Sequence, residues 1–263
     1  MNITYHKGTL LLNGDYNIPN TRWDARSRCY RAQAMYYRDI LYYLKHSRIP
    51  YDDTVLELIH CPELYAPLRL RGYQKTATER WMHQQKGVIV MPTGSGKTVV
   101  ALKLIEQINA PVFIVVPTLD LVRQWKEALH LFKVDIGEYT GDNKDIQAIT
   151  VSTYDSAYLN AENLGNRFKF LIFDEVHHLP AEGYQQIAEM FAAPFRLGLT
   201  ATYEREDGRH REIPRLIGGK VYEIHTDELT GKYLSPYETK KIFVALTEEE
   251  ELEYEQYHQG MPR

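Results

Sequence analysis

One stretch of the chain, residues 88–100, is compatible with few folds. Val88-Ile89-Val90-Met91 is an apolar run of strand length, and residues 92–96 follow it as a short loop with two glycines. From Lys97 onward, apolar residues recur at helical spacing, at Ala101, Leu104, Ile105 and Ile108. A strand, a glycine-containing loop and a helix in this order indicate an α/β sheet with an anion site at the end of a strand.

The residues of this loop have the chemistry of a phosphate site. Gly94 and Gly96 allow a sharp turn in which successive N–H groups point at one anion. Lys97 is expected to reach the β- and γ-phosphates of a nucleotide, and the Thr98 hydroxyl to hold Mg²⁺. The predicted nucleotide-binding residues here are Thr93, Gly94, Ser95, Gly96, Lys97 and Thr98. Met91 stands where the first glycine of this pattern usually lies, and the alternative is a chance turn between a strand and a helix.

Composition limits the class of protein. The chain has 263 residues, 44% of them hydrophobic, and a formal net charge of -4, which suits a sizeable core in one or two domains. Because the balance is acidic, any binding of nucleic acid must come from local basic patches. Cys29 and Cys61 are too few for a disulfide framework or a zinc site, and we expect both to be reduced, in the cytoplasm. No apolar segment of signal-peptide or membrane-spanning length is found.

Four further apolar runs are short and do not alternate with polar residues. They occupy residues 112–116, 148–151, 170–173 and 196–199, and helical segments separate them. One of these segments places Val122, Trp125, Leu129 and Phe132 on a single face. Buried strands alternating with helices predict an α/β fold, a mostly parallel sheet with helices on both faces, whose ligands bind at the carboxyl ends of the strands.

Two adjacent acids, Asp174 and Glu175, directly follow the apolar run 170–173. Asp174 is expected to bind Mg²⁺, mostly through water, and Glu175 to orient and deprotonate an attacking water. A capped helix start would explain each acid separately, but it would not explain their position relative to the loop at 92–96. The predicted catalytic residues are therefore Lys97, Asp174 and Glu175, and the predicted metal ligands are Thr98 and Asp174.

The first 60 residues differ in composition and residue pattern from the rest. Residues 9–15 predict a strand that ends in a turn, and the spacing of Tyr30, Ala34, Tyr37, Leu41 and Leu44 predicts a helix over residues 26–45. Between residues 22 and 48, Lys and Arg outnumber the acids and alternate with aromatic side chains. This composition suits a nucleic-acid surface, although composition alone favours a solvated basic helix face whose tyrosines pack a small core.

Changes in composition and residue pattern along the chain also predict the domain boundaries. Residues 61–67 are interpreted as a linker between a small α+β domain at 1–60 and a larger domain at 61–245. Residues 246–263 form an acidic tail, with a solvated helix expected near 248–255. We expect this tail to lead to a further domain.

The motifs Gly94-Ser95-Gly96-Lys97-Thr98, Asp174-Glu175-Val176-His177 and Thr200-Ala201-Thr202 occur in the order of a superfamily-two helicase, which the chain resembles. The resemblance implies a RecA-like first helicase domain. It implies that Gln74, in Tyr73-Gln74, pairs with adenine, and that Thr200 and Thr202 couple the γ-phosphate site to a nucleic-acid groove. The nucleic-acid contacts that it implies are Pro117, Thr118, Ser152 and Thr153, with Thr140-Gly141 as a weaker similarity.

A narrower resemblance is carried by Arg205-Glu206-Asp207, which is similar to the RED motif of the XPB DNA-repair helicases. Residues 8–38 resemble the damage-recognition domain of archaeal XPB. This resemblance implies an ATP- and Mg²⁺-dependent 3'-5' DNA helicase or translocase of nucleotide excision repair and transcription. The implied partners are damaged, forked or duplex DNA, a second helicase domain and a repair nuclease, with no membrane. Arg205, Glu206 and Asp207 are then expected to contact nucleic acid, as a wedge or strand contact at a fork.

The arginine fingers of this family lie in the second helicase domain, which we expect to be missing from these 263 residues. Because arginine fingers contribute roughly 10³–10⁵ in rate to related enzymes, we expect the chain alone to bind ATP weakly and to hydrolyse it very slowly. Three alternatives remain open: an ATP-switched DNA-junction-binding module, an RNA helicase and a restriction-type translocase subunit.

Overall fold

The computed structural model describes residues 1–14, 18–233, 235, 247 and 250. The chain divides into two units, Met1–Leu229 and Thr230–Arg263, and all helices and strands described below belong to the first. The helix predicted near 248–255 lies outside the described residues. In the described part of the chain, no helix has both the length and the apolar character that crossing a membrane requires.

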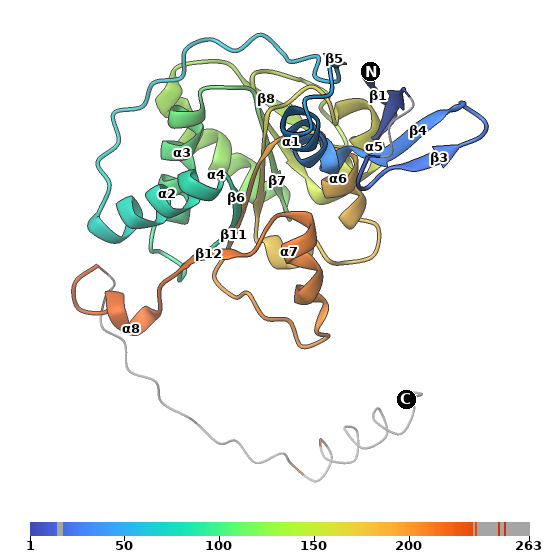
Figure 1. The fold of residues 1–263 in the computed structure, drawn as a ribbon. Helices are drawn as coiled ribbons and strands as arrows, with labels where there is room; N and C mark the ends of the chain where they lie inside the picture. Colours follow the sequence, from blue (N-terminus) through green and yellow to red (C-terminus); the bar gives the residue numbers. More distant parts are fainter. Residues whose placement is uncertain (15–17, 234, 236–246, 248–249, 251–263) are drawn as a thin grey trace. The chain divides into compact units, whose positions relative to one another are not determined.

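The N-terminal part is a five-stranded sheet in the order β3-β4-β2-β1-β5 (Figure 1). Its strands are β1 (Asn2–His6), β2 (Thr9–Asn13), β3 (Arg22–Asp24), β4 (Cys29–Gln33) and β5 (Asp52–Thr54). The pairing is antiparallel except between β1 and β5, which run parallel. Helix α1 (Tyr37–His46) contributes Tyr37, Ile40 and Leu44 to a core with Ile3, Leu10 and Leu12.

The helix predicted over residues 26–45 is wrong in its first half. Residues 29–33 form strand β4, and α1 begins at Tyr37, after a short 3₁₀ turn at Ala34–Tyr36. The physical reason is pairing with β2, in the register Leu12↔Tyr30 and Leu10↔Ala32, which takes the backbone hydrogen bonds that a helix would need. The strand predicted within residues 9–15 is confirmed as β2, over Thr9–Asn13.

The larger part is a seven-stranded parallel sheet in the order β12-β6-β11-β10-β7-β9-β8. Its strands are β6 (Lys86–Val90), β7 (Val112–Val116), β8 (Ile136–Tyr139), β9 (Ile149–Thr153), β10 (Phe170–Asp174), β11 (Phe195–Thr200) and β12 (Lys220–Glu223). Among the described residues, β8 and β12 form the two edges of this sheet.

Helices cover the two faces of this sheet (Figure 1). On one side lie α2 (Gly72–Gln84), α3 (Lys97–Ile108) and α4 (Leu119–Leu129), and on the other lie α5 (Tyr154–Leu164), α6 (Gln185–Met190) and α7 (Ile213–Leu216). A further short helix, α8 (Thr226–Leu229), follows β12. The parallel α/β fold predicted from the apolar runs is therefore confirmed. Because the strands are parallel, the segments that follow their carboxyl ends gather along one edge of the sheet.

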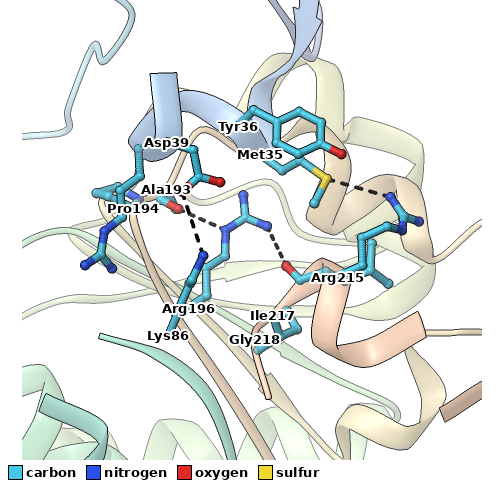
Figure 2. A pocket seen from close by; sticks show the side chains of 12 residues that line it. Met35, Tyr36, Asp39, Lys86, Ala193, Pro194, Arg196, Arg215, Ile217 and Gly218 are labelled. Carbon is cyan, nitrogen blue, oxygen red and sulfur yellow. Dashed lines mark hydrogen bonds and ion pairs between the residues drawn. The ribbon is translucent and has the colours of Figure 1, made fainter. Parts of the chain in front are cut away.

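The two sheets meet in a junction that contains both apolar and polar contacts. Ala192, from the larger part, belongs to the core of the N-terminal sheet. The Tyr5 hydroxyl donates to the carbonyl oxygens of Met190 at 3.1 Å and Glu162 at 3.0 Å. On α1, the Asp39 carboxylate lies 3.8 Å from the Lys86 ammonium at the start of β6 (Figure 2).

Arg196 lies next to the same junction, inside the larger sheet. Its guanidinium is buried and donates to the carbonyl oxygens of Ala193 and Leu216 (Figure 2). It also donates to the carbonyl oxygens of Ala188 and Phe191. Arg196 pairs in register with Lys86, and Thr200 pairs with Val90. Strands β6 and β11 therefore begin together at the junction and end together at the opposite edge of the sheet.

Candidate nucleotide site

The loop between β6 and α3 has the backbone that an anion site needs. Gly94 and Gly96 adopt φ values of 76° and 84°, and Gly96 caps the N-terminus of α3. A Cβ at position 96 would clash with the side-chain amide of Gln74. The glycine at 96 is thus required twice, by its left-handed backbone and by the close approach of Gln74.

Lys97 and Met91 connect this loop to the neighbouring strand. The Lys97 ammonium donates to the carbonyl oxygens of Met91 at 3.2 Å and Pro92 at 3.4 Å. The Met91 N–H donates to the Thr200 carbonyl at 3.0 Å, so the loop is fixed to the end of β11. Ser95 is fully buried, whereas Thr93 and Gly94 are exposed, so the loop opens to solvent at these two residues.

Two side chains of helix α2 hydrogen-bond to this loop. The Tyr73 hydroxyl donates to the Ser95 carbonyl at 2.7 Å, and the Gln74 amide donates to the same oxygen at 3.0 Å. The Gln74 amide oxygen also accepts the Arg71 N–H at 2.9 Å, at the N-terminus of α2. Gln74 is therefore a buried support of the phosphate-binding loop in this structure, and its pairing with adenine stays a prediction.

Asp174 ends β10 as a buried carboxylate. One oxygen accepts the Trp125 indole N–H at 2.7 Å, and the other accepts the Glu175 N–H at 3.0 Å. Burial raises the pKa of Asp174, and the bond from Trp125 opposes that rise. The donor set fits Mg²⁺, since an Asp174 oxygen and the Thr98 hydroxyl are the hard oxygen ligands this ion takes beside phosphates and water. No group of three or more His, Cys, Asp or Glu in the described chain could hold a metal ion by itself.

Glu175 has a left-handed backbone, with φ 46° and ψ 56°. Such a conformation costs a non-glycine residue about 1–3 kcal/mol and persists only where neighbouring contacts fix it. The buried Tyr154 hydroxyl supplies one contact, since it lies 3.1 Å from the Asp174 carbonyl and 3.5 Å from the Glu175 carbonyl. A hydrogen bond with His177 and the charge of Lys97 lower the pKa of the Glu175 carboxyl.

Thr200 and His177 complete a cluster around Glu175. The His177 Nδ1 lies 3.0 Å from the Thr200 hydroxyl and 3.4 Å from a Glu175 carboxylate oxygen. The Thr200 hydroxyl lies 3.3 Å from the same carboxylate and 2.7 Å from the Thr202 carbonyl. Thr200 is fully buried here, whereas Thr202 is exposed. The structure thus places Thr200 between the acid and the surface segment at 202.

The predicted nucleic-acid contacts at 117–118 and 152–153 lie farther along the same edge, at the ends of β7 and β9. The Thr118 and Thr153 hydroxyls cap α4 and α5, each accepting a backbone N–H at 3.3 Å. Pro117 is half-buried and Thr118 is exposed. Ser152, by contrast, is fully buried, and its hydroxyl donates to the Tyr139 carbonyl at 2.6 Å, so its side chain faces the interior in this structure.

The segment 205–207 follows β11 near the same edge. Together with His177 and Glu204, its residues line an open hollow of about 400 Å³. Arg205 and Asp207 form an ion pair at 2.7 Å, which raises the pKa of Arg205 and lowers that of Asp207. Glu206 is exposed.

A separate hollow of about 870 Å³ lies on the N-terminal sheet, far in sequence from the nucleotide loop. Its lining includes the exposed ring of Trp23 and the guanidinium groups of Arg22, Arg26 and Arg31. Trp23 packs edge-on against Tyr30, with ring centroids 5.3 Å apart. Arg31 lies 3.3 Å from the Asp24 carboxylate, whose pKa is lowered by the Arg26 N–H and the Ser27 hydroxyl. A fixed aromatic ring among arginines suits an unpaired nucleobase and its phosphates.

Sequence reasoning assigned no role to three residues that contact the acids. Trp125 lies on a predicted apolar helix face, His177 belongs to the motif at 174–177, and Tyr154 directly follows the predicted contacts at 152–153. In the structure these three side chains hold Asp174 or Glu175. Nothing in the spacing of Trp125 or Tyr154 separates such a contact from ordinary core packing.

Two family models match the chain in consecutive regions. The model described as "Xeroderma pigmentosum group B helicase damage recognition domain" matches residues 3–55. The model described as "Type III restriction enzyme, res subunit" matches residues 67–205, which is more than half of the chain.

Curated relatives include proteins from an archaeon and a bacterium. The chain is 44% identical to "DNA 3'-5' translocase XPB2" of Sulfurisphaera tokodaii, over 96% of this chain and 57% of that protein. It is 34% identical to "DNA 3'-5' helicase XPB" of Mycobacterium tuberculosis, over 71% of this chain and 35% of that protein. The chain therefore spans 57% of the length of the first relative and 35% of the length of the second.

Among solved structures, the UvsW helicase from bacteriophage T4 has a TM-score of 0.52 with this chain. The match covers 84% of this chain and 99% of the other, at 14% identity. At this identity the likeness concerns the fold alone.

Proposed function

The chain belongs to the XPB family of DNA 3'-5' helicases and translocases, and from this membership we propose that it forms the ATP-binding half of such a motor. The motor couples ATP hydrolysis to the opening of DNA in nucleotide excision repair, with transcription as a second process of the family. We place the activity in the cytoplasm. The observation that carries the proposal is that the phosphate-binding loop, Asp174, Glu175 and Thr200 gather at one edge of a single sheet.

Each residue of this edge has a proposed role. The loop 93–98 binds the phosphates of ATP, with Lys97 at the β- and γ-phosphates, and Gln74 contacts adenine. Thr98 and Asp174 would hold Mg²⁺, which supplies neutralisation of the phosphate charge when it is bound. Glu175, whose carboxylate is ionised at neutral pH, orients the attacking water and accepts its proton.

We propose two surfaces for DNA. Pro117, Thr118 and Thr153 lie at the ends of β7 and β9, and helix N-termini with hydroxyls suit a phosphate backbone. Ser152 supports this segment from within. Glu206 is exposed in the segment that follows β11, and Thr200 and Thr202 connect that segment to the ATP site. The hollow around Trp23 is the second surface, on the N-terminal sheet.

We further propose that residues 1–263 alone hydrolyse ATP slowly. In this family the arginine fingers come from a second helicase domain, which we count as a partner together with a repair nuclease. Steady-state hydrolysis by this segment should be roughly 10³-fold or more below that of the full-length gene product with DNA, since an arginine finger contributes that much in related enzymes. Equal rates would contradict the proposal.

The first experiment compares ATP hydrolysis by the full-length gene product without nucleic acid and with forked DNA, duplex DNA or RNA. Stimulation by DNA, and its loss in Glu175→Gln, is the expected result. Stimulation by RNA alone would favour an RNA helicase, and four equal rates would mean an ATPase that is uncoupled from nucleic acid.

Another candidate is a DNA-junction-binding module in which ATP acts as a switch. The hollow around Trp23 favours it, because such a site could bind DNA whether or not ATP is hydrolysed. Distortion of DNA that persists in Glu175→Gln with ATP bound would support the switch, and its loss would support the motor. A restriction-type subunit is disfavoured, because residues 3–55 match a damage-recognition domain.

A further inference from the structure

The side chains of Arg205, Glu206 and Asp207 do not face the same way. The guanidinium of Arg205 pairs with the Asp207 carboxylate through two bonds, Nε to Oδ1 at 2.9 Å and Nη2 to Oδ2 at 2.7 Å. Its remaining nitrogen, Nη1, donates to the carbonyl oxygen of His177. Glu206 is exposed, and its side chain makes no hydrogen bond or ion pair recorded within the described residues. Two of the three side chains are therefore engaged by the protein itself.

The carbonyl that Arg205 binds belongs to the turn that carries Glu175. A 3₁₀ turn, Val176–His178, begins directly after the left-handed backbone of Glu175. The Tyr154 hydroxyl fixes the carbonyls before this turn, and Arg205 fixes a carbonyl inside it. A strained backbone of this kind keeps its conformation only while such contacts hold it.

His177 connects the held backbone to the acid. Its ring nitrogen lies 3.0 Å from the Thr200 hydroxyl and 3.4 Å from the Glu175 carboxylate, while its carbonyl receives the Arg205 guanidinium. The position of the imidazole, and with it that of the Glu175 carboxylate, depends on where the His177 backbone is held. A planar guanidinium can bind a carboxylate and a carbonyl at the same time, which an ammonium cannot do with equal geometry.

We propose that Arg205 is a positioning residue for Glu175, and that Asp207 holds the Arg205 guanidinium in place. The inference rests on the role of Glu175 given under the proposed function. It assigns Arg205 and Asp207 to the hydrolysis site in the absence of nucleic acid, and it leaves Glu206 as the outward-facing member of the three. Arg205 then affects the rate of hydrolysis rather than the binding of ATP.

The first test measures ATP hydrolysis without nucleic acid in the full-length gene product. Arg205→Ala should lower kcat about tenfold or more and leave KM for ATP within about twofold, because it displaces the acid without touching the nucleotide. Arg205→Lys should recover only part of the loss. The matched control is Arg209→Ala in the same segment, since Arg209 is exposed and its backbone N–H, not its side chain, bonds Asp207.

The second test does not depend on activity. Hydrogen–deuterium exchange over residues 173–180 reports the His178 and Leu179 amides, which donate to the carbonyls of Glu175 and Val176 at 3.0 Å each. Exchange of these amides should be faster in Arg205→Ala and unchanged in Arg209→Ala. Unchanged exchange in Arg205→Ala, equal kinetic losses in both variants, or a loss confined to KM would each overturn the inference. Absence of hydrolysis in the unmodified protein would instead refute the proposed function, and exchange would still decide whether Arg205 holds the turn.

Discussion

Two buried tryptophans differ in the charge of their acceptors. Trp125 donates its indole N–H to the Asp174 carboxylate at 2.7 Å, whereas Trp81 donates to the neutral carbonyls of Gly87 and Arg196 at 3.2 Å. Both side chains are almost fully buried. The two tryptophans are therefore similarly buried, and they differ in whether the hydrogen-bond acceptor is a charged carboxylate or a neutral carbonyl.

Replacing either tryptophan by phenylalanine should destabilise the protein by about 1–3 kcal/mol, because each change leaves a buried acceptor without its donor. Trp125→Phe alone should also lower ATP hydrolysis, since it frees the carboxylate that would hold Mg²⁺. Chemical denaturation measures the first effect, and steady-state ATPase assays of the full-length gene product measure the second. Equal hydrolysis in Trp125→Phe and Trp81→Phe would show that the bond to Asp174 has no catalytic consequence.

Trp23 is the second residue whose contribution can be isolated. Its ring is 53% exposed in the hollow of the N-terminal sheet, and Tyr42 is 64% exposed on α1 without lining that hollow. Trp23→Ala should weaken binding of DNA that contains an unpaired base roughly tenfold, the usual size of one lost base–aromatic stack. Tyr42→Ala should leave that affinity unchanged. Fluorescence anisotropy with a labelled duplex distinguishes these outcomes, and equal losses would remove the hollow from the DNA surface.

The sequence indicates candidate site residues where their chemistry is tied to a motif. Lys97, Asp174 and Glu175 could be named because two acids after an apolar strand, downstream of a glycine loop, have few other uses. Trp125 and Tyr154 could not be assigned, since a residue at an apolar helical position is explained by packing alone. Their partners lie far away in the sequence, and only the folded chain brings them together.

At the scale of elements, prediction succeeded for central strands and failed at the edges. The strands at 112–116, 170–173 and 196–199 are buried between neighbours, and Arg196 is the one charged residue in these three stretches. The two edge strands, β8 and β12, were not predicted. An edge strand contacts one neighbour and keeps polar residues such as Glu138 and Lys220, so the apolar pattern is interrupted.

The turn between β1 and β2 offers a test of how closely the two sheets approach each other. Gly8 has φ +78°, and a Cβ there would lie 2.8 Å from the Cβ of Met190 at the end of α6. Gly208 has a similar φ of +71°, but a Cβ there would meet nothing within 4 Å. Gly208→Ala therefore isolates the backbone strain, and Gly8→Ala adds a steric conflict with the other part of the molecule.

We expect Gly208→Ala to cost about 1–2 kcal/mol of unfolding free energy, the ordinary cost of a left-handed alanine. Gly8→Ala should cost about 1–3 kcal/mol more, because the added methyl group overpacks the contact with Met190. Urea denaturation of both variants provides the comparison. A cost for Gly8→Ala no larger than that of its control would mean that the turn and α6 can move apart freely.

At the scale of the whole molecule, residues 1–229 should unfold as one unit. Ala192 lies in the core of the N-terminal sheet, and Tyr5 bonds carbonyls of the larger part. Thermal unfolding followed at a probe near Trp23 and at a second probe in the larger sheet should therefore give coincident transitions. A transition at lower temperature at the first probe would show that the N-terminal sheet unfolds separately from the larger part, against the prediction.

Strands β6 and β11 start at the junction and finish at the candidate nucleotide site, so the path from one to the other is about 16 Å of extended backbone. A strand in the middle of a parallel sheet can neither stretch nor change register without breaking its ladder on both sides. The pair of strands therefore transmits a displacement along its length and does not absorb it by stretching. A displacement imposed on Lys86 through Asp39 would therefore reach Met91 and Thr200 at the other end of the two strands.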